Sequence, residues 1–512
     1  MEELCYRFPV IGELVLNNLD EQSLSNCKEA SRVVSQFVIN ERFFWIRIIR
    51  KYYEELREFK TSWETVIHRT SADILKKLAI AVHRFFTKHQ LRFAFNWSPF
   101  HIAAESGLMQ LCTHVYQKSD IHQLENKNAV NKKGRTSQHV AAQNENYCDL
   151  TPLHLSAQNG HLEIYRLISD TLGDKKPVNS SGITPLHLSA KQGNLEICQL
   201  ITESLDNKNP ATRIGNTPLH LSARNGHLEI CQLIMNSLEN KNPENNAGVT
   251  PLHLSAQGGH MAICNLIMDT LENKNPANIT GVTPLHVSAR EGHLDICRFI
   301  MNYLENKNPV AENSLLTPLH LSAENGHLEI CKMIMDTLKN KNPCNSHGIT
   351  PLHLAALKGH LDTCWLFMNT LEDKNIADNN GITPLHFYAR LGHLEMCKII
   401  MDNLKNKNPA SNSGITPLHL AALEGHLDTC RFIMNTLENK NIADNNGWTP
   451  LHSSAKNGHL AIYLLIRNTL KDKNPANNNG VTPLQLAFNK GHFEICKSVD
   501  ADIQRKRKKP TR

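Results

Sequence analysis

The sequence has no long apolar run and little net charge, and these two absences exclude several classes of protein. No apolar stretch in the 512 residues is long enough to span a membrane, and Glu2 and Glu3 stand where a secretory signal would carry positive charge. The formal net charge is +6, and six positive charges lie between Arg505 and Arg512. Removing these six from the 55 Lys and Arg leaves 49, which equals the number of Asp and Glu. We therefore expect a soluble, intracellular chain that does not bind membrane, and we do not expect nucleic acid as its partner.

Motifs of catalysis and cofactor binding are also missing from the sequence. It contains no glycine-rich phosphate loop, no metalloprotease motif, and no pair of carboxylates that stands outside the pattern described below. We therefore predict that the protein is not an enzyme and has no catalytic residues, no cofactor and no metal site.

What the sequence does contain is a repeat. The tripeptide Thr-Pro-Leu occurs eleven times at a spacing of 33 residues, except for one step of 34. It begins at Thr151, Thr184, Thr217, Thr250, Thr283, Thr317, Thr350, Thr383, Thr416, Thr449 and Thr482. A fixed period of this length is typical of solenoids, in which each unit buries its apolar face against its neighbours. We therefore predict eleven regular repeats over residues 151–499.

The repeat that begins at Thr217 shows what each unit encodes. Thr217 is a good helix cap, and the proline after it suits the first helical turn. Gly226 ends this short helix, and His227 opens a second helix with apolar residues at helical spacing. Pro243 prevents the second helix from continuing, and a polar loop leads to the next threonine. The predicted fold is therefore all-α, built from helix-turn-helix-loop units.

This unit resembles the ankyrin repeat, which has the same Thr-Pro-Leu-His opening and the same Gly-His before its second helix. The resemblance covers most of the chain and implies a stack of helix pairs that binds other proteins in a groove lined by loop tips and first helices. One departure recurs, because Leu205, Leu238 and their equivalents stand where the family usually has glycine. We expect the second helix to run slightly longer there and to end on an asparagine.

Nine of the 14 cysteines fall at one position of the repeat, which suggests a structural role. They are Cys198, Cys231, Cys264, Cys297, Cys331, Cys364, Cys397, Cys430 and Cys496. Equivalent residues of stacked repeats lie about 8–10 Å apart, which exceeds the roughly 7 Å limit between the Cα atoms of a disulfide. We interpret these thiols as small buried apolar groups in a reducing compartment.

The histidines follow the repeat in the same way. Of the 28, ten follow the leucine of the opening motif and ten follow the turn glycine. His227 and Cys231 have the spacing of half a zinc site, but the same pair recurs in later repeats and no repeat is distinguished. We therefore favour histidines that form hydrogen bonds to the backbone over metal ligands.

The N-terminal part of the chain lacks the period. Residues 7–53 contain three short amphipathic pieces with a polar break, and they resemble an F-box. Phe8-Pro9 stands where that family opens with Leu-Pro, whereas the position of its central tryptophan is occupied by valine. The resemblance implies that residues 1–55 bind a Skp-type adaptor, and through it a cullin. The residues implied in this contact are Phe8, Pro9, Leu14, Leu24 and Trp45.

The remaining segments are assigned by composition. Residues 56–96 are predicted to be a helical linker or cap, and residues 97–150 to hold divergent and truncated repeats. In the last repeat Gln485 and Phe488 break the pattern, as a capping repeat would. The basic tail at 500–512 is either a nuclear-import signal or a solvated terminus. We expect a cytoplasmic protein, with the nucleus as the alternative.

Binding specificity must lie in the positions that differ between repeats. The eighth residue of each repeat should line the groove, and it changes from basic to apolar along the chain. We predict that the groove contains Lys191, Arg224, Arg290, Leu357, Tyr388, Leu391, Leu423 and Trp448. Exposed apolar clusters with aromatic anchors concentrate binding energy, so a partner with acidic and apolar portions is expected. The alternative is that the apolar side chains bury against one another.

Two hypotheses of function follow from these modules. In the first, the protein is a substrate-recognition subunit of a Skp–cullin–F-box-type ubiquitin ligase, and the repeats hold the substrate. In the second, it is a plain ankyrin scaffold with no link to ubiquitin, and its N-terminal helices only cap the stack.

Overall fold

The computed structural model describes residues 150–171, 177–312, 315–402 and 404–507. These residues form 22 α-helices and, within the same ranges, no strand. The F-box-like segment, with Phe8, Pro9, Leu14, Leu24 and Trp45, lies outside the described residues. The same holds for the predicted linker at 56–96 and for almost all of the predicted divergent repeats.

The helices come in eleven pairs, and each pair begins at one of the Thr-Pro-Leu motifs. The first helices are α12 (Pro152–Asn159), α14 (Pro185–Gln192), α16 (Pro218–Asn225), α18 (Pro251–Gly258), α20 (Pro284–Glu291), α22 (Pro318–Glu324), α24 (Pro351–Lys358), α26 (Pro384–Leu391), α28 (Pro417–Glu424), α30 (Pro450–Lys456) and α32 (Pro483–Asn489). The second helices are α13 (Leu162–Thr171), α15 (Leu195–Ser204), α17 (Leu228–Met235), α19 (Met261–Met268), α21 (Leu294–Met301), α23 (Leu328–Met335), α25 (Leu361–Thr370), α27 (Leu394–Asp402), α29 (Leu427–Asn435), α31 (Leu460–Thr469) and α33 (Phe493–Arg507). The predicted all-α repeat is confirmed in this part of the chain.

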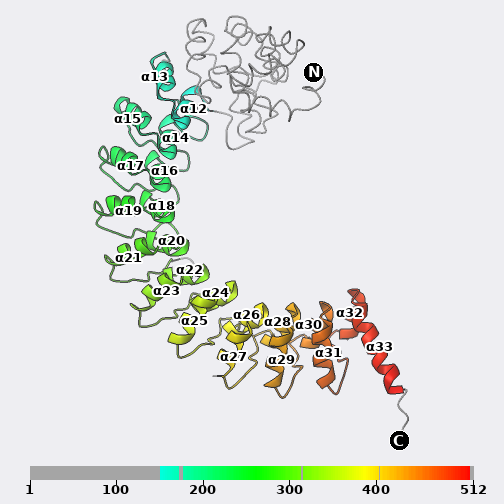
Figure 1. Cartoon of the computed structure of the whole chain (residues 1–512). Helices are drawn as coiled ribbons and strands as arrows, with labels where there is room; N and C mark the ends of the chain where they lie inside the picture. Colours follow the sequence, from blue (N-terminus) through cyan, green and yellow to red (C-terminus); the bar gives the residue numbers. More distant parts are fainter. Residues whose placement is uncertain (1–149, 172–176, 313–314, 403, 508–512) are drawn as a thin grey trace, which may run out of the picture. The chain divides into compact units, whose positions relative to one another are not determined.

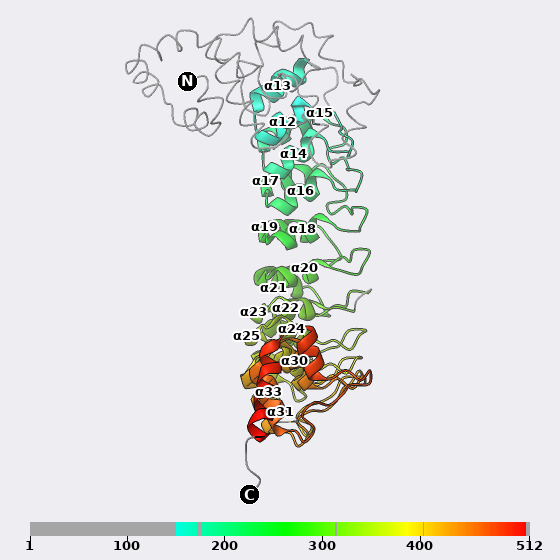
Figure 2. The same cartoon turned by 90° about the vertical axis from the view of Figure 1, so that its right-hand side faces the viewer.

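The chain divides into two compact units, one that ends at Thr270 and one that begins at Leu271. We call them the N-terminal unit, with helices α12 to α19, and the C-terminal unit, with helices α20 to α33. Within each unit the first helices form one layer and the second helices form another (Figure 1). The loops that connect consecutive repeats project to one side of both layers (Figure 2).

The ends of the first helix follow from local chemistry. Thr217 has the extended backbone of an N-cap, and the proline after it occupies the first helical position. Gly226 ends α16 with a left-handed φ of 84°, which a residue with a Cβ adopts only with strain. A Cβ on Gly226 would also lie 2.6 Å from the ring of His260 in the next repeat. Glycine is therefore required both by the turn and by the stacking.

The histidine of the opening motif ties each repeat to the next. In His220, Nδ1 accepts hydrogen bonds from the backbone N–H of Thr217 at 3.2 Å and from its hydroxyl at 2.9 Å. The other ring nitrogen, Nε2, donates to the carbonyl of Val249 at 3.0 Å, directly before the next repeat. Burial lowers the pKa of His220 to about 4, so the ring is neutral at physiological pH. The predicted structural role of these histidines is confirmed here.

The column of cysteines lies between the two helix layers. Of the nine, eight are buried and Cys496 is half-buried, and none of them forms a disulfide. The Cys231 thiol donates to the Ser222 hydroxyl at 3.2 Å. Burial raises the pKa of the Cys231 thiol to about 12, so it stays protonated and unreactive at neutral pH. These side chains act as small core residues, as predicted.

The longer second helix predicted from the sequence is present in some repeats and absent in others. Helix α15 runs to Ser204 with Leu205 as its C-cap, and α25 and α31 end in the same way before Leu371 and Leu470, whereas others are shorter. Helix α17 ends at Met235 with Asn236 as its cap, so Leu238 lies beyond it, and the equivalent helix α19 is capped by an aspartate. A later asparagine holds the loop in place. The Asn242 side chain accepts a hydrogen bond from the backbone N–H of Leu252 at 3.0 Å. The polar segment therefore closes the loop onto the next first helix rather than lengthening the second helix.

Asparagines also join consecutive loops in the C-terminal unit. Asn412 donates from its backbone N–H to the carbonyl of Asn380 at 2.8 Å, and from its side chain to the carbonyl of Asn379 at 2.9 Å. Asn445 and Asn478 repeat this pattern on the loops that follow. The loops thus form a hydrogen-bonded ladder, which fixes their positions relative to one another.

The C-terminal end of the chain differs from the prediction. Helix α33 continues to Arg507, so residues 500–507, which were expected in a tail, belong to the last helix. None of the described helices is both long enough and apolar enough to cross a membrane.

Candidate protein-binding surface

The eighth residue of each repeat has a fixed backbone and a side chain that is free to differ. The carbonyl of Lys191 accepts a hydrogen bond from Nε2 of His227 in the next repeat at 3.1 Å, and the carbonyl of Arg224 accepts one from His260 at 3.0 Å. The Lys191 and Arg224 side chains are exposed. We use the name first-helix row for the eighth and ninth residues of the ten repeats that begin at Thr151 to Thr449.

In the N-terminal unit the first-helix row is positively charged. None of the first helices α12, α14, α16 and α18 contains an acidic residue. Neither Lys191 nor Arg224 forms an ion pair among the described residues. Two unneutralised cations on successive repeats therefore face solvent.

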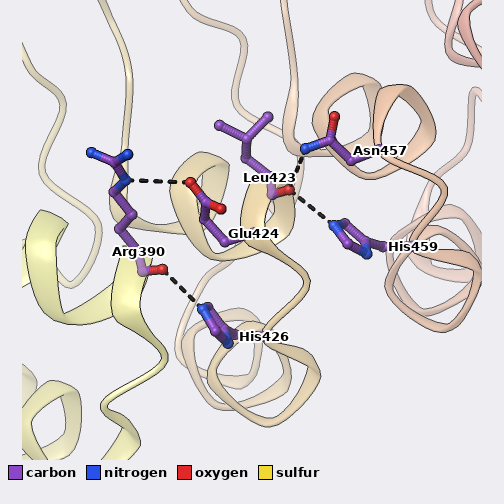
Figure 3. Close-up of polar contacts among 6 residues, drawn as sticks. All are labelled: Arg390, Leu423, Glu424, His426, Asn457 and His459. Atoms are coloured by element: carbon purple, nitrogen blue, oxygen red, sulfur yellow. Dashed lines mark hydrogen bonds and ion pairs between the residues drawn. The ribbon is translucent and has the colours of Figure 1, made fainter. Parts of the chain in front are cut away.

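In the C-terminal unit the charged residues of the first-helix row between Glu324 and Glu424 neutralise one another, whereas Lys456 lies over the Trp448 ring. The Lys358 ammonium lies 3.5 Å from the Glu324 carboxylate of the preceding repeat. Arg390 donates to the Glu424 carboxylate of the following repeat at 3.3 Å (Figure 3). Each pair joins the eighth residue of one repeat to the ninth residue of the next.

Figure 3 also shows how the backbone beneath these side chains is held. The carbonyl of Arg390 accepts from His426 at 2.9 Å. The carbonyl of Leu423 accepts from Asn457 at 2.7 Å and from His459 at 3.0 Å. The main chain at these positions is therefore held in place before any partner binds, which lowers the entropic cost of binding.

Between the two ion pairs the row is apolar. Leu357 and Leu391 occupy the eighth and ninth positions that Glu324 and Lys358 occupy one repeat earlier, and each leucine is 39% exposed. The C-terminal unit thus presents an ion pair, two leucines and a second ion pair in sequence. Arg290, which was predicted to extend the basic part of the groove, lies in this unit and is paired with Glu291 at 2.9 Å.

Tyr388 is not a groove residue, which corrects the prediction from the sequence. Its side chain is 0% exposed and packs in the core. Seven repeats have a serine at this position, and five of these serines form a hydrogen bond with a cysteine thiol, but in the preceding repeat the serine is replaced by Ala355. The Tyr388 phenol lies beside the Cys364 thiol of that repeat, and burial raises the pKa of Tyr388 well above its usual value. The alternative of local burial is correct for this residue.

Leu423 and Trp448 are half-buried, so they are only partly available to a partner. The Trp448 ring lies 5.6 Å from the ring of His452, and the Lys456 ammonium is 5.5 Å from its centroid. Two residues of the first helix that follows, α30, thus lie against the indole. Trp365 is exposed on the second helix α25, in the layer away from the first helices.

Of the ninth positions, only Leu391 was predicted from the sequence to lie in the groove. Lys358 and Glu424 complete the row, and opposite charges spaced 34 residues apart could have indicated them. The sequence analysis also missed Phe493, and it took Phe488 as part of a cap, although both rings are exposed at the end of the array.

Nothing in the site points to catalysis or metal binding. Within the part of the chain that the structure describes, no group of three or more His, Cys, Asp and Glu residues is arranged to hold a metal ion. What the row offers is charge and apolar surface on a fixed backbone, which suits recognition of a polypeptide.

Comparison with known proteins gives one family. The model of a family described as ankyrin repeats (3 copies) matches six overlapping stretches of the chain, at residues 144–213, 204–275, 219–313, 302–378, 364–443 and 433–507. A comparison with curated proteins finds no match.

Proposed function

Because the chain belongs to the ankyrin-repeat family, we propose that it is a non-catalytic protein-binding array whose first-helix row holds a segment of a partner protein. Ankyrin repeats are protein-interaction modules, and this family membership covers residues 144–507. The partner segment that fits the row carries acidic residues, which pair with the basic residues of the N-terminal unit.

The observation that carries this proposal is the pair of unneutralised cations, Lys191 and Arg224. They lie on successive repeats, and stacked helices are about 8–10 Å apart. An extended polypeptide advances about 3.3 Å per residue. Two carboxylates about three residues apart on an extended partner segment would therefore match the spacing of the two cations.

The leucine pair supplies a second, apolar contact in the C-terminal unit. Leu357 and Leu391 lie between ion pairs whose charges are already satisfied, so apolar contact is the main attraction available there. The N-terminal unit therefore favours an acidic portion of a partner, and the C-terminal unit favours an apolar portion.

The finer part of the proposal is that the bound protein is a ubiquitination substrate. It rests on the F-box-like segment at residues 1–55, in which Phe8, Pro9, Leu14, Leu24 and Trp45 would contact a Skp-type adaptor and so recruit a cullin. The array would then raise the local concentration of substrate lysines at the ligase. The chain itself would carry out no chemistry.

The test of the row uses a charge reversal with a matched control. In K191E/R224E we expect an acidic fluorescein-labelled peptide to bind at least about tenfold more weakly, since two favourable contacts become repulsive. The control K339E/K471E makes the same change of net charge at exposed lysines outside the row. Fluorescence anisotropy of the full chain measures both, and an equal loss in both variants would disprove the role of the row.

The test of the ligase hypothesis is separate. In L14K/L24K we expect loss of a purified Skp-type adaptor in a pull-down, with unchanged helical circular dichroism. If the wild-type chain does not retain the adaptor, or if L14K/L24K still does, the protein is a plain scaffold. Neither outcome affects the proposal for the row.

A further inference from the structure

The last repeat ends in two exposed aromatic rings. The seventh residue is alanine in the ten preceding repeats, and each of these alanines is fully buried. They are Ala157, Ala190, Ala223, Ala256, Ala289, Ala323, Ala356, Ala389, Ala422 and Ala455. The eleventh repeat has Phe488 at this position, and its side chain is 63% exposed. Phe493, the first residue of α33, is 54% exposed and packs edge-to-face against Phe488, with ring centroids 5.9 Å apart.

No described part of the chain covers this end. In the preceding repeat a Cβ on Gly447 would lie 2.6 Å from Asn478, and a Cβ on Gly458 would lie 2.5 Å from His492. At the equivalent glycines of the last repeat, Gly480 and Gly491, no described atom lies within 4 Å. The surface that stacking buries everywhere else in the C-terminal unit is open here.

A further repeat cannot stack on this surface in the same way. Alanine is the residue that allows neighbouring first helices to approach, and a phenyl ring in its place would overfill that contact. A twelfth repeat could therefore not stack on Phe488 with the close contact that alanine allows elsewhere. Terminal repeats of solenoids usually present a polar outer face, so two exposed rings at this end indicate a surface with another occupant.

The charges beside the rings indicate the chemistry of that occupant. Lys490 and Lys497 are exposed, and neither forms an ion pair within the described ranges. Lys497 follows Phe493 by four residues and so lies on the same face of α33. From Lys490 to Arg512 the sequence has eight basic and three acidic residues. An acidic ligand is therefore favoured over a basic or neutral one.

We propose that Phe488, Phe493, Lys490 and Lys497 form a second docking surface, the end face, which binds a short acidic segment of a partner protein. An apolar side chain of that segment packs against the two rings, and its carboxylates pair with the two lysines. Aromatic residues surrounded by polar groups are the usual anchors of such contacts. The end face shares no residue with the pair Lys191 and Arg224, so each surface can be changed without altering the other.

The chain itself offers the variant that tests the end face without harming the fold. In F488A/F493L the first change introduces the residue found in the ten other repeats, and the second introduces the leucine with which nine of the other ten second helices begin. The thermal unfolding midpoint should therefore stay unchanged. The probe is a labelled peptide of Asp and Glu residues that carries one Trp and two Leu, titrated against the full chain by fluorescence anisotropy.

In the K191E/R224E background, which removes the acidic contact of the row, we expect F488A/F493L to bind this peptide at least about tenfold more weakly, because both anchors are lost. K490E/K497E should weaken binding too and should reduce its dependence on salt. K191E/R224E should leave the contact at the end face intact, which separates this proposal from the function proposed for the row. Matched peptides with Lys in place of the acidic residues, or with Ala in place of Trp and Leu, should bind weakly.

Three results would overturn the proposal. Unchanged peptide binding when F488A/F493L is added to K191E/R224E would show that the rings are not anchors. Equal binding of the basic peptide would show that charge does not select the occupant. A wild-type dimer in sedimentation velocity that dissociates in F488A/F493L would show that the end face binds a second copy of this chain instead.

Discussion

The two units carry the same backbone at the first-helix row and different chemistry on it. Among the described residues, Lys191 and Arg224 of the N-terminal unit have no counter-ion, whereas Lys358 and Arg390 of the C-terminal unit are each paired with a glutamate of a neighbouring repeat. In both units the carbonyl of the eighth residue is held by a histidine of the next repeat. The repeat therefore specifies where a side chain stands, and the residue at that position specifies what it attracts.

This division separates residues that stack the array from residues that recognise a partner. Histidines, turn glycines and loop asparagines are shared between repeats because they contact the next repeat, and cysteines are shared because they fill the core of each repeat. The eighth and ninth residues can vary because their side chains reach solvent. Changes that disturb the shared residues should affect both units alike. Substitutions in the first-helix row should affect binding more than stability.

The largest expected effect comes from acid, which acts on the shared set. Burial lowers the pKa of His187 and His220 in the N-terminal unit to about 4, and does the same for His320 and His386 in the C-terminal unit. Unfolded histidine titrates near pH 6.5, so the unfolded chain binds more protons between pH 6.5 and 4. The stabilisation is complete above pH 6.5 and is lost as the pH falls toward 4, at roughly 1 kcal/mol per pH unit for each histidine.

Hydrogen exchange at pH 7, 5.5 and 4.5 measures this loss in each unit. Both units should lose protection over the same range, and loss in one unit alone would contradict a shared stacking device. Glutamine provides the control, because Gln485 accepts the backbone N–H of Thr482 at 2.9 Å as histidine does elsewhere. Replacing His187, His220, His320 and His386 by glutamine should therefore keep the array folded and reduce its sensitivity to acid.

The second-largest expected effect distinguishes a core residue from a row residue within one helix. Helix α26 carries both Tyr388 and Leu391. Y388A should lower the free energy of unfolding by about 3–5 kcal/mol, because it removes a fully buried aromatic side chain. L391A should change it by no more than about 0.5 kcal/mol, because the leucine is on the surface. Urea unfolding measures both. Similar losses in the two variants would mean that the leucine pair belongs to the core, and the apolar part of the row would then be wrong.

Tyr388 also shows where prediction from the sequence ends. The period of Thr-Pro-Leu and the proline and glycine punctuation predicted all eleven helix pairs, because these depend on neighbours within one repeat. The burial of Tyr388 could not be predicted, because it depends on the space and the thiol that the preceding repeat provides at Ala355 and Cys364. The ion pairs of the row were missed for the same reason, since each joins two repeats.

The smallest expected effect comes from variants that make the first-helix row of the C-terminal unit resemble that of the N-terminal unit. In E324Q/E424Q the glutamates that neutralise Lys358 and Arg390 lose their charge but keep their size, so the C-terminal row should come to resemble the row at Lys191 and Arg224. Exposed ion pairs contribute about 0–1 kcal/mol, so stability should change little. Two newly unpaired cations should raise the affinity for an acidic peptide by about twofold to fivefold at low salt, and added salt should remove the gain.

Net charge alone could produce a similar gain, so the matched control is E372Q/E438Q, which neutralises two exposed glutamates outside the row. Anisotropy titrations of both variants at two salt concentrations distinguish the causes. A gain confined to E324Q/E424Q would show that pairing between repeats, and not the total charge, determines what the C-terminal row attracts. An equal gain in the control would remove the distinction between the two rows, because long-range attraction by the whole chain would then account for binding.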